Sequence, residues 1–155
     1  MNIKYVTGDL FDVISNITDS NILVPHIVND KGVFGAGFAA AVTRHYPIVR
    51  QRYLEWDTHD ILGNVQFVSV TPNITFANMG GQHGTVSKQN PKPIKYFKLA
   101  LAMSIIEDIN DDFEIVAPRF GSGLAKGCWP FIEELIDELW IGAGIPVTIV
   151  TPNNA

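Results

Sequence analysis

Two glycine-rich segments have the composition of loops that bind phosphate. They are residues 32–37, GVFGAG, and residues 121–127, GSGLAKG, and each follows a predicted strand and precedes a predicted helix. Glycine lets the backbone approach a ligand closely, and the following helix offers unpaired N–H groups to an anion. Because ligands of α/β sheets bind beyond the carboxyl ends of the strands, we expect both segments at one edge of a sheet. The sequence therefore predicts a phosphate-containing ligand between them.

Neither segment is typical of a standard nucleotide fingerprint. The run GAGFAA at 35–40 has the spacing Gly-x-Gly-x-x-Ala, but residues 29–34 separate it from the preceding strand, whereas a Rossmann turn follows its strand at once. Residues 121–127 lack the spacing of a P-loop. A nucleotide-binding α/β domain of another kind therefore stays as an alternative.

Two histidines occupy positions from which they could transfer protons. His26 lies in an apolar strand, three residues before Asn29, so a core role and a functional role are both open. His83 lies in the polar segment 80–84, which either closes over a ligand or forms a flexible turn. A positioned histidine that transfers a proton contributes ~10²–10⁴-fold to a rate.

Asp9 directly follows the first predicted strand. Its carboxylate could accept a hydrogen bond from an exocyclic amine such as that of adenine, or it could cap a helix. Both interpretations stay open on the residues alone. The sequence contains neither a Gly-x-Ser-x-Gly nucleophile motif nor the HExxH spacing of a metal site, so no metal is expected.

Composition narrows the class of protein. The 155 residues suffice for a single domain, expected to span 1–155, and 46% of them are hydrophobic. The net charge is −5 and the basic residues are scattered, which disfavours nucleic acid as a partner. One cysteine allows no internal disulfide and fits a cytoplasmic location, and no signal peptide or membrane-spanning run is evident.

The order of predicted elements favours an α/β sheet with helices on both faces. The positions of proline and glycine and the periodicity of apolar residues indicate where each strand and helix lies. The predicted strands are 3–7, 22–28, 65–71, 74–79, 114–118 and 147–150, and the predicted helices begin near residues 38, 47, 94 and 130. Pro25 indicates an edge strand or a bulge in the second strand. The long loop 80–93 is expected to be functional.

Apolar spacing also predicts which helix faces point inward. In the helix that begins near residue 94, the expected buried stripe is Ile94, Phe97, Leu101 and Ile105. In the helix that Pro130 opens, the residues expected to point inward are Phe131, Leu135 and Leu139, with the acidic residues outward.

Five strings in this order resemble the macrodomain family over almost the whole chain. They are YVTGDLF (5–11), HIVN (26–29), GAGFA (35–39), NMGGQHG (78–84) and PRFGSGL (118–124). The chain looks most similar to the branch that holds the yeast ADP-ribose 1''-phosphate phosphatase and many bacterial and phage macrodomain proteins. The resemblance implies a three-layer α/β/α sandwich with a mixed central sheet and an ADP-ribose cleft across the strand ends.

The resemblance also implies which residues bind the ligand. Asp9 would hold the adenine amine, with its neighbour Leu10 also in the binding set, and Asn29 would reach the distal ribose. The two glycine-rich loops would clasp the diphosphate with backbone amides. The contacts implied there are Phe34, Gly35, Ala36, Gly37, Gly121, Ser122, Gly123, Leu124 and Ala125. Phe34 and Trp129 would be either ligand walls or core supports.

Departures from a related branch narrow the expected activity. Where the terminal ADP-ribose protein glycohydrolase has a catalytic aspartate, this chain has Ala125, and the strand 74–78 offers no counterpart to the catalytic lysine of that enzyme. Many bacterial relatives have an acidic or amide residue at the position of Cys128. By contrast, His26 and the Gly-Gly-x-His-Gly segment resemble the branch of the family that holds the phosphatase.

The sequence therefore favours hydrolysis of ADP-ribose 1''-phosphate without a metal or cofactor. His26 or His83 would transfer the proton, Asn29 would orient the distal ribose, and glycine amides would stabilise the phosphate. Two alternatives stay open. The protein could be a non-catalytic module that binds ADP-ribose or a related NAD-derived signal. It could also be a hydrolase that removes ADP-ribose from macromolecules, which would then be its partners.

Overall fold

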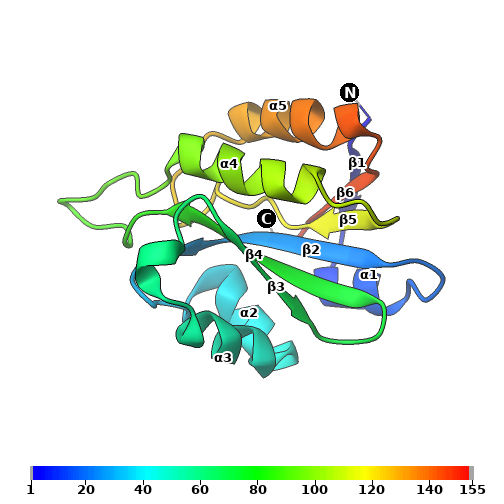
Figure 1. Ribbon diagram of the computed structural model, residues 1–155, viewed down its shortest axis with the longest axis horizontal. Helices are drawn as coiled ribbons and strands as arrows, with labels where there is room; N and C mark the ends of the chain where they lie inside the picture. The colour runs from blue at the N-terminus through cyan, green and yellow to red at the C-terminus, as the bar shows by residue number, and fades with distance from the viewer. Residues whose placement is uncertain (1, 154–155) are drawn as a thin grey trace.

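A computed structural model describes residues 2–153 and contains one six-stranded mixed sheet (Figure 1). In sheet order the strands are β1 (Lys4–Thr7), β6 (Val147–Thr151), β5 (Glu114–Ala117), β2 (Ile22–Asn29), β4 (Ile74–Gln82) and β3 (Val65–Ser69). Only the β3–β4 pair is antiparallel among the strand pairs of the described residues. The carboxyl ends of the other five strands therefore lie at the same edge of the sheet.

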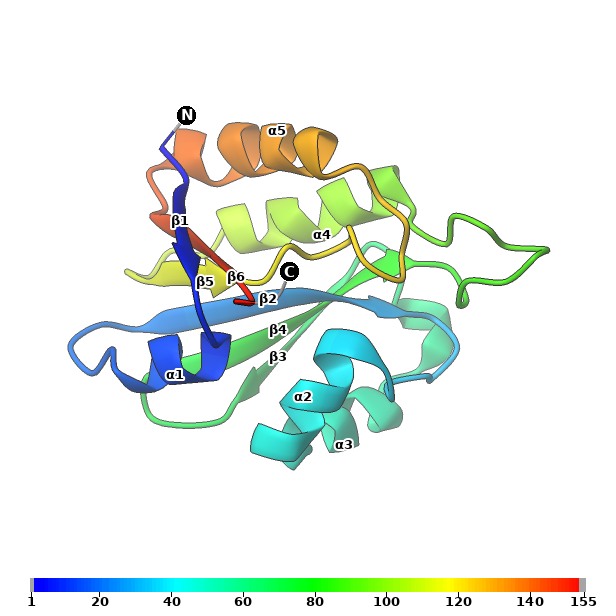
Figure 2. The same cartoon turned by 180° about the vertical axis from the view of Figure 1, so that it is seen from behind.

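Helices cover both faces of the sheet (Figure 2). One face carries α1 (Leu10–Ser15), α2 (Gly37–His45) and α3 (Pro47–Glu55), and the other carries α4 (Tyr96–Glu107) and α5 (Trp129–Leu139). Short 3₁₀ helices lie at Thr58–Asp60 and Ile141–Ala143. Two apolar cores, one on each face, hold the three layers together, which confirms the predicted α/β sandwich with a mixed sheet.

The buried face of α4 differs from the predicted one. Phe97 is 72% exposed, and Leu101 and Ile105 also face solvent, although Ile94, just before the helix, is buried. The residues that contact the core are Leu99, Ala102, Met103 and Ile106. Because α4 is apolar on nearly all sides, spacing alone could not select the face that the sheet covers. The prediction of the inward stripe is wrong for this reason.

A similar correction applies to α5. Phe131 is 47% exposed, and Leu135 and Leu139 are only partly buried. The fully inward positions are Ile132, Ile136 and Trp140, each one residue further along the chain.

The interpretation of Pro25 as a sign of an edge strand is wrong, whereas the bulge offered as the alternative occurs in the same strand but not at Pro25. β2 lies in the interior of the sheet, and its register shift falls between Val28 and Asn29. The short β5 pairs with β2 only at Ile22 and Leu23. Pro25 therefore lies beyond the residues of β2 that pair with β5, and its missing N–H leaves no ladder bond to β5 unmade.

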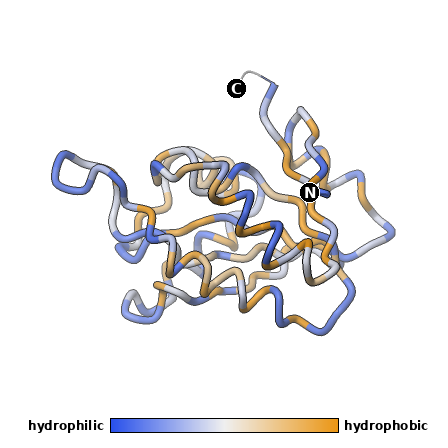
Figure 3. The backbone as a smooth tube through the Cα atoms, turned by 90° about the horizontal axis from the view of Figure 1, so that it is seen from above, coloured by the Kyte–Doolittle hydropathy of each residue, from blue (hydrophilic) through white to orange (hydrophobic). Residues whose placement is uncertain are grey.

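The predicted loop 80–93 begins later than expected, because β4 continues to Gln82. Gly80 pairs with the turn before β3, donating to the Asn64 carbonyl and accepting from the Gly63 N–H. The remaining loop projects from the molecule and is largely hydrophilic (Figure 3). Its base is closed by an isolated bridge between Gln82 and Ile94. No helix within residues 2–153 has the length and apolar composition needed to cross a bilayer.

Candidate functional site

A cavity of about 730 Å³ opens at the carboxyl ends of β2 and β5. It is lined by residues 26–29, 33–39 and 118–126 and by Gln82, Thr85 and Val86. The two glycine-rich segments thus face each other across one cavity, at the edge of the sheet where the sequence places them. Its volume lies within the range of small-molecule sites.

Unpaired backbone donors line this cavity. The N–H groups of Gly35, Ala36, Gly123, Leu124 and Ala125 make no hydrogen bond to any other described residue. N–H groups that are grouped in a concave loop form a binding site for an anion, because each carries a partial positive charge. The two facing loops can therefore hold a diphosphate from both sides.

The loop 121–127 is wound tightly enough to present these donors. Gly121 has φ +83°, and a Cβ there would lie 2.8 Å from Ile132 Cδ1, so glycine is required. The Gly127 N–H donates to the Gly121 carbonyl at 2.7 Å and closes the loop. Lys126 has φ 61°, which is uncommon for a non-glycine residue and indicates local backbone strain. Its N–H bonds to the Gly123 carbonyl at 3.0 Å.

The charge of the lining is opposite to that of the whole protein. The net charge of the chain is −5, yet the lining residues include Arg119 and Lys126 and no aspartate or glutamate. Cationic side chains beside unpaired N–H groups favour an anionic ligand. The lining residues thus carry positive formal charge in a protein whose net charge is negative.

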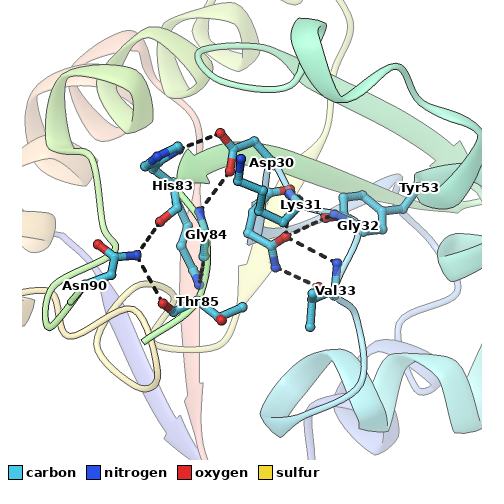
Figure 4. A network of polar contacts seen from close by, with 11 residues as sticks. Asp30, Lys31, Gly32, Val33, Tyr53, His83, Gly84, Thr85 and Asn90 are labelled. Carbon is cyan, nitrogen blue, oxygen red and sulfur yellow. Dashed lines mark hydrogen bonds and ion pairs between the residues drawn. The ribbon is translucent and has the colours of Figure 1, made fainter. Parts of the chain in front are cut away.

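Asn29 organises the loop that follows β2, and Figure 4 labels Lys31, Gly32 and Val33 of this loop. Its Oδ1 accepts hydrogen bonds from the N–H groups of Lys31 at 2.9 Å and Val33 at 3.3 Å, and its Nδ2 donates to the Val33 carbonyl at 2.7 Å. The Tyr53 hydroxyl, from α3, lies 3.0 Å from the same Oδ1, donates to the Asn29 carbonyl at 2.5 Å and accepts the Gly32 N–H at 3.1 Å. One Nδ2 hydrogen of Asn29 remains for a ligand.

Tyr53 anchors the loop that follows β2 through its buried hydroxyl. Burial raises the pKa of Tyr53 to about 12, so the phenol stays protonated and keeps its donor at all ordinary pH values. Tyr53 is 1% exposed, and its ring contacts that of Phe34 with centroids 5.2 Å apart. Phe34 is itself buried and also lines the cavity, so it belongs both to the core and to the cavity wall.

We expect Tyr53→Phe to lower the free energy of unfolding by about 2 kcal/mol, because it leaves the buried Asn29 carbonyl and Gly32 N–H without their partner. Urea denaturation would measure this loss. Tyr46→Phe is the matched control, since the Tyr46 hydroxyl makes no hydrogen bond within the described residues. Equal stability of the two variants would contradict the anchoring role.

His83 pairs with Asp30 at the edge of the site (Figure 4). His83 Nδ1 lies 2.7 Å from Asp30 Oδ2, and Asp30 Oδ1 accepts the Gly84 N–H at 2.8 Å. Partial burial raises the pKa of Asp30, but the Gly84 N–H and His83 outweigh it and hold that pKa below its ordinary value. The stabilisation from this carboxylate is therefore present above its ordinary pKa and is lost as pH falls through the lowered one. His83 is half-exposed and does not line the cavity.

His26 lies in the cavity wall and is 3% exposed. Its Nε2 lies 2.6 Å from Asn78 Oδ1, and its ring forms T-shaped pairs with the rings of Phe34, Phe38 and Phe76. Burial lowers the pKa of His26 to about 4, against the hydrogen bond to Asn78, which favours the charged form. The imidazole is therefore neutral at pH 7.

Asp9 and Leu10, of the predicted binding set, lie outside the cavity lining, as does Trp129, which the sequence offered as ligand wall or core support. Asp9 caps α1, a helix that the sequence did not predict, by accepting the Phe11 N–H at 2.8 Å. Leu10 is buried in the core, and Trp129 supports the opposite layer, with its Nε1 donating to the Tyr5 hydroxyl. The cap leaves the second carboxylate oxygen of Asp9 without a described partner. Of the two roles offered for Trp129, the structure shows the core role.

Several residues at the site were not singled out from the sequence. Gln82, Thr85, Val86, Arg119 and Lys126 line the cavity, and Asp30 and Tyr53 fix its loops. Asp30 directly follows Asn29 and could have been found by that position. Tyr53 gave no signal, because an aromatic residue in a helix is normally a core residue. Within residues 2–153, no group of three His, Cys, Asp or Glu side chains could hold a metal ion.

Comparisons with known proteins show which proteins this chain is similar to. No model of a known protein family matches the sequence. An ADP-ribose 1''-phosphate phosphatase from Lodderomyces elongisporus is 39% identical over 150 residues, covering 90% of this chain and 93% of the relative. A solved structure from Bacteroides thetaiotaomicron has a TM-score of 0.85 and 31% identity, over 96% of this chain and 99% of that one. A macrodomain protein from Streptomyces coelicolor has a TM-score of 0.78 and 33% identity, over 96% and 97%.

Proposed function

Because this chain belongs to the macrodomain family, we propose that its cavity binds ADP-ribose or a close derivative. The observation that carries this proposal is the pair of facing loops with unpaired N–H groups, in a lining that holds Arg119 and Lys126 and no carboxylate. A diphosphate fits that chemistry, because it offers oxygen acceptors to both loops at once. The contacts proposed for it are Phe34, Gly35, Ala36 and Gly37 on one side and Gly121, Ser122, Gly123, Leu124 and Ala125 on the other.

The orientation proposed for the ligand is the one that the family resemblance implies. The distal ribose lies toward Asn29, whose remaining Nδ2 hydrogen can donate to a ribose hydroxyl. The adenine lies toward Asp9 and Leu10, where the free carboxylate oxygen of Asp9 can accept its amine. Asn29 thus both shapes the loop and contacts the ligand.

We further propose that the protein hydrolyses ADP-ribose 1''-phosphate. A water oxygen bonds to phosphorus while the P–O bond to C1'' breaks; water loses a proton and the departing ribose oxygen gains one. Catalysis of phosphoryl transfer rests mainly on positioning and on stabilising the phosphoryl charge, which the loop N–H groups and the two cations supply. The relative that is 39% identical bears the name of this activity.

Of the two candidate histidines, His26 is the better placed. It lines the cavity and is neutral at pH 7, so it can accept a hydrogen bond or proton from an O–H group. His83 is held by Asp30 outside the lining. We propose proton transfer by His83 only for a ligand that extends beyond the mouth of the cavity.

Calorimetric titration with ADP-ribose, followed by phosphate release from ADP-ribose 1''-phosphate, tests the proposal. We expect binding and many turnovers, and a loss of at least ~100-fold in kcat when His26 and His83 are both replaced by alanine. His83→Ala alone is expected to lose much less, which makes it the matched control. Unchanged turnover in the double variant would show that neither histidine transfers the proton.

A non-catalytic binding module is the second candidate, favoured by one observation. The lining contains no aspartate or glutamate that could act as general base, and buried Ala125 stands where the glycohydrolase branch has its catalytic aspartate. ADP-ribose binding without phosphate release would select it. A hydrolase that removes ADP-ribose from macromolecules is a separate proposal, in which ADP-ribosylated macromolecules are the partners, and release of ADP-ribose from a modified protein would test it. A cytoplasmic location is proposed for the protein under each of these functions.

A further inference from the structure

A chain of hydrogen bonds connects the surface of α3 to the histidine in the cavity wall. Gln66 Nε2, on β3, donates to the Arg52 carbonyl at 2.8 Å. Asn78 Nδ2, on β4, donates to Gln66 Oε1 at 3.0 Å, and Asn78 Oδ1 lies 2.6 Å from His26 Nε2. Three side chains from three adjacent strands are thus joined in one line.

The direction of every bond in this line is fixed by its outer end. A backbone carbonyl can only accept, so the amide nitrogen of Gln66 must face Arg52 and its oxygen must face Asn78. Asn78 must then donate to Gln66 with its nitrogen, which leaves its oxygen toward His26. An oxygen there accepts, so His26 carries its proton on Nε2 and a lone pair on Nδ1.

The lone pair on Nδ1 is open to the cavity. Nδ1 makes no hydrogen bond within residues 2–153. Every fully buried polar side-chain atom of these residues has a hydrogen-bond partner, so Nδ1 is not fully buried. Nδ1 is therefore the ring nitrogen that reaches the cavity, although His26 as a whole is 97% removed from solvent, with 3% exposed.

We infer that Gln66 and Asn78 are positioning residues that hold His26 as the Nε2–H tautomer, so that its Nδ1 accepts a hydrogen bond from an O–H group in the cavity. The O–H group belongs either to the distal ribose or to the attacking water. The identity of this O–H group rests on the proposed function. The tautomer of His26 does not depend on the proposed function.

The surroundings keep this acceptor neutral. The partners of the ring are Phe34, Phe38 and Phe76 from the loop, α2 and β4, together with Asn78, and none is titratable. No charged group acts on the His26 pKa, which burial lowers to about 4. Because a neutral imidazole is needed, the acceptor is present above that pKa and is lost as pH falls through it.

The first test measures the ring ¹⁵N resonances of the free protein at pH 7, with and without Gln66→Met. We expect His26 to be the Nε2–H tautomer in the wild type and a mixture in the variant, because Asn78 becomes free to rotate. Gln51→Met, on the exposed face of α3, is the matched control and should match the wild type. An Nδ1–H tautomer in the wild type would overturn the inference.

The second test measures Kd for ADP-ribose and kcat for ADP-ribose 1''-phosphate in the same variants. A rise of about tenfold in Kd for Gln66→Met identifies the ribose as the O–H donor, whereas an equal fall in kcat at constant Kd identifies the water. If the tautomer changes and neither quantity does, the acceptor role is wrong. If the wild type turns nothing over but shows the expected tautomer and Kd effect, the hydrolysis proposal fails while the positioning role stands.

Asn78→Asp gives an independent readout. An ionised carboxylate beside Nε2–H favours the charged imidazole, so the acid limb of Kd against pH should move upward by about 2 units. Asn78 is fully buried, so the Asn78→Asp variant could lose its fold. If it does, the test rests on Gln66→Met. A folded Asn78→Asp protein with an unshifted acid limb would contradict the inference.

Discussion

Replacing Gly80 by alanine is expected to lower the free energy of unfolding by about 3 kcal/mol, at the upper end of the range for overpacked sites. A Cβ at this position would lie 1.8 Å from the carbonyl oxygen of Ile61 and 2.5 Å from its carbonyl carbon. Backbone atoms cannot turn aside as a side chain can, and Gly80 is itself held at both its N–H and its carbonyl by the adjacent turn. The strand or the turn must therefore move.

Urea denaturation would measure the effect of Gly80→Ala. Gly123→Ala is the matched control, because a Cβ there meets no atom within 4 Å and Gly123 has no positive φ. It should change stability by less than about 0.5 kcal/mol. If Gly80→Ala were as stable as Gly123→Ala, the close approach of β4 to Ile61 would not exist in solution.

Replacing Asn29 by alanine is expected to raise the Kd for ADP-ribose by at least about 100-fold, equivalent to about 2.7 kcal/mol. The side chain accepts from two loop N–H groups and donates to the Val33 carbonyl, so its loss removes what holds the loop 29–33 against the cavity. Asn29 is also 94% removed from solvent, with 6% exposed, and the polar groups left behind are partly buried. The free energy of unfolding should fall by about 3 kcal/mol as well.

Calorimetry with ADP-ribose below the unfolding temperature separates the two effects of Asn29→Ala. Asn21→Ala is a suitable control, because Asn21 is exposed and its side chain makes one long hydrogen bond, 3.5 Å to the Asp112 carbonyl. A Kd within about threefold of the wild type in a folded Asn29→Ala protein would mean that the loop holds its shape without this side chain. The ligand contact proposed for Asn29 would then be wrong too.

Sequence reasoning located the cavity well because its signals are local. The glycine-rich runs at 32–37 and 121–127 are defined by the φ values and close approaches that their own residues must adopt. Alternating strands and helices then placed both runs at one edge of the sheet, since parallel strands share their carboxyl ends. The strand ends themselves were less certain, and β4 runs through two glycines that a local pattern assigns to a loop.

The same reasoning failed where two local choices were equivalent. α4 carries apolar residues around most of its circumference, and only contact with the sheet selects Leu99 and Met103 over Phe97 and Leu101. Phe131 on α5 is exposed for the same reason. An amphipathic pattern predicts a buried face only when one stripe is distinctly more apolar than the others.

The sequence by itself determined the α/β architecture, the family resemblance and the two loops that line the cavity. Only the tertiary structure decided how the polar side chains are used. Asn78 lies 52 residues from His26 and Tyr53 lies 24 residues from Asn29, yet each pair shares a hydrogen bond. Such bonds arise where strand register and helix packing bring distant residues together, and a linear sequence contains no periodic signal for them. The protonation of His26 and the shape of the loop 29–33 are therefore consequences of the fold.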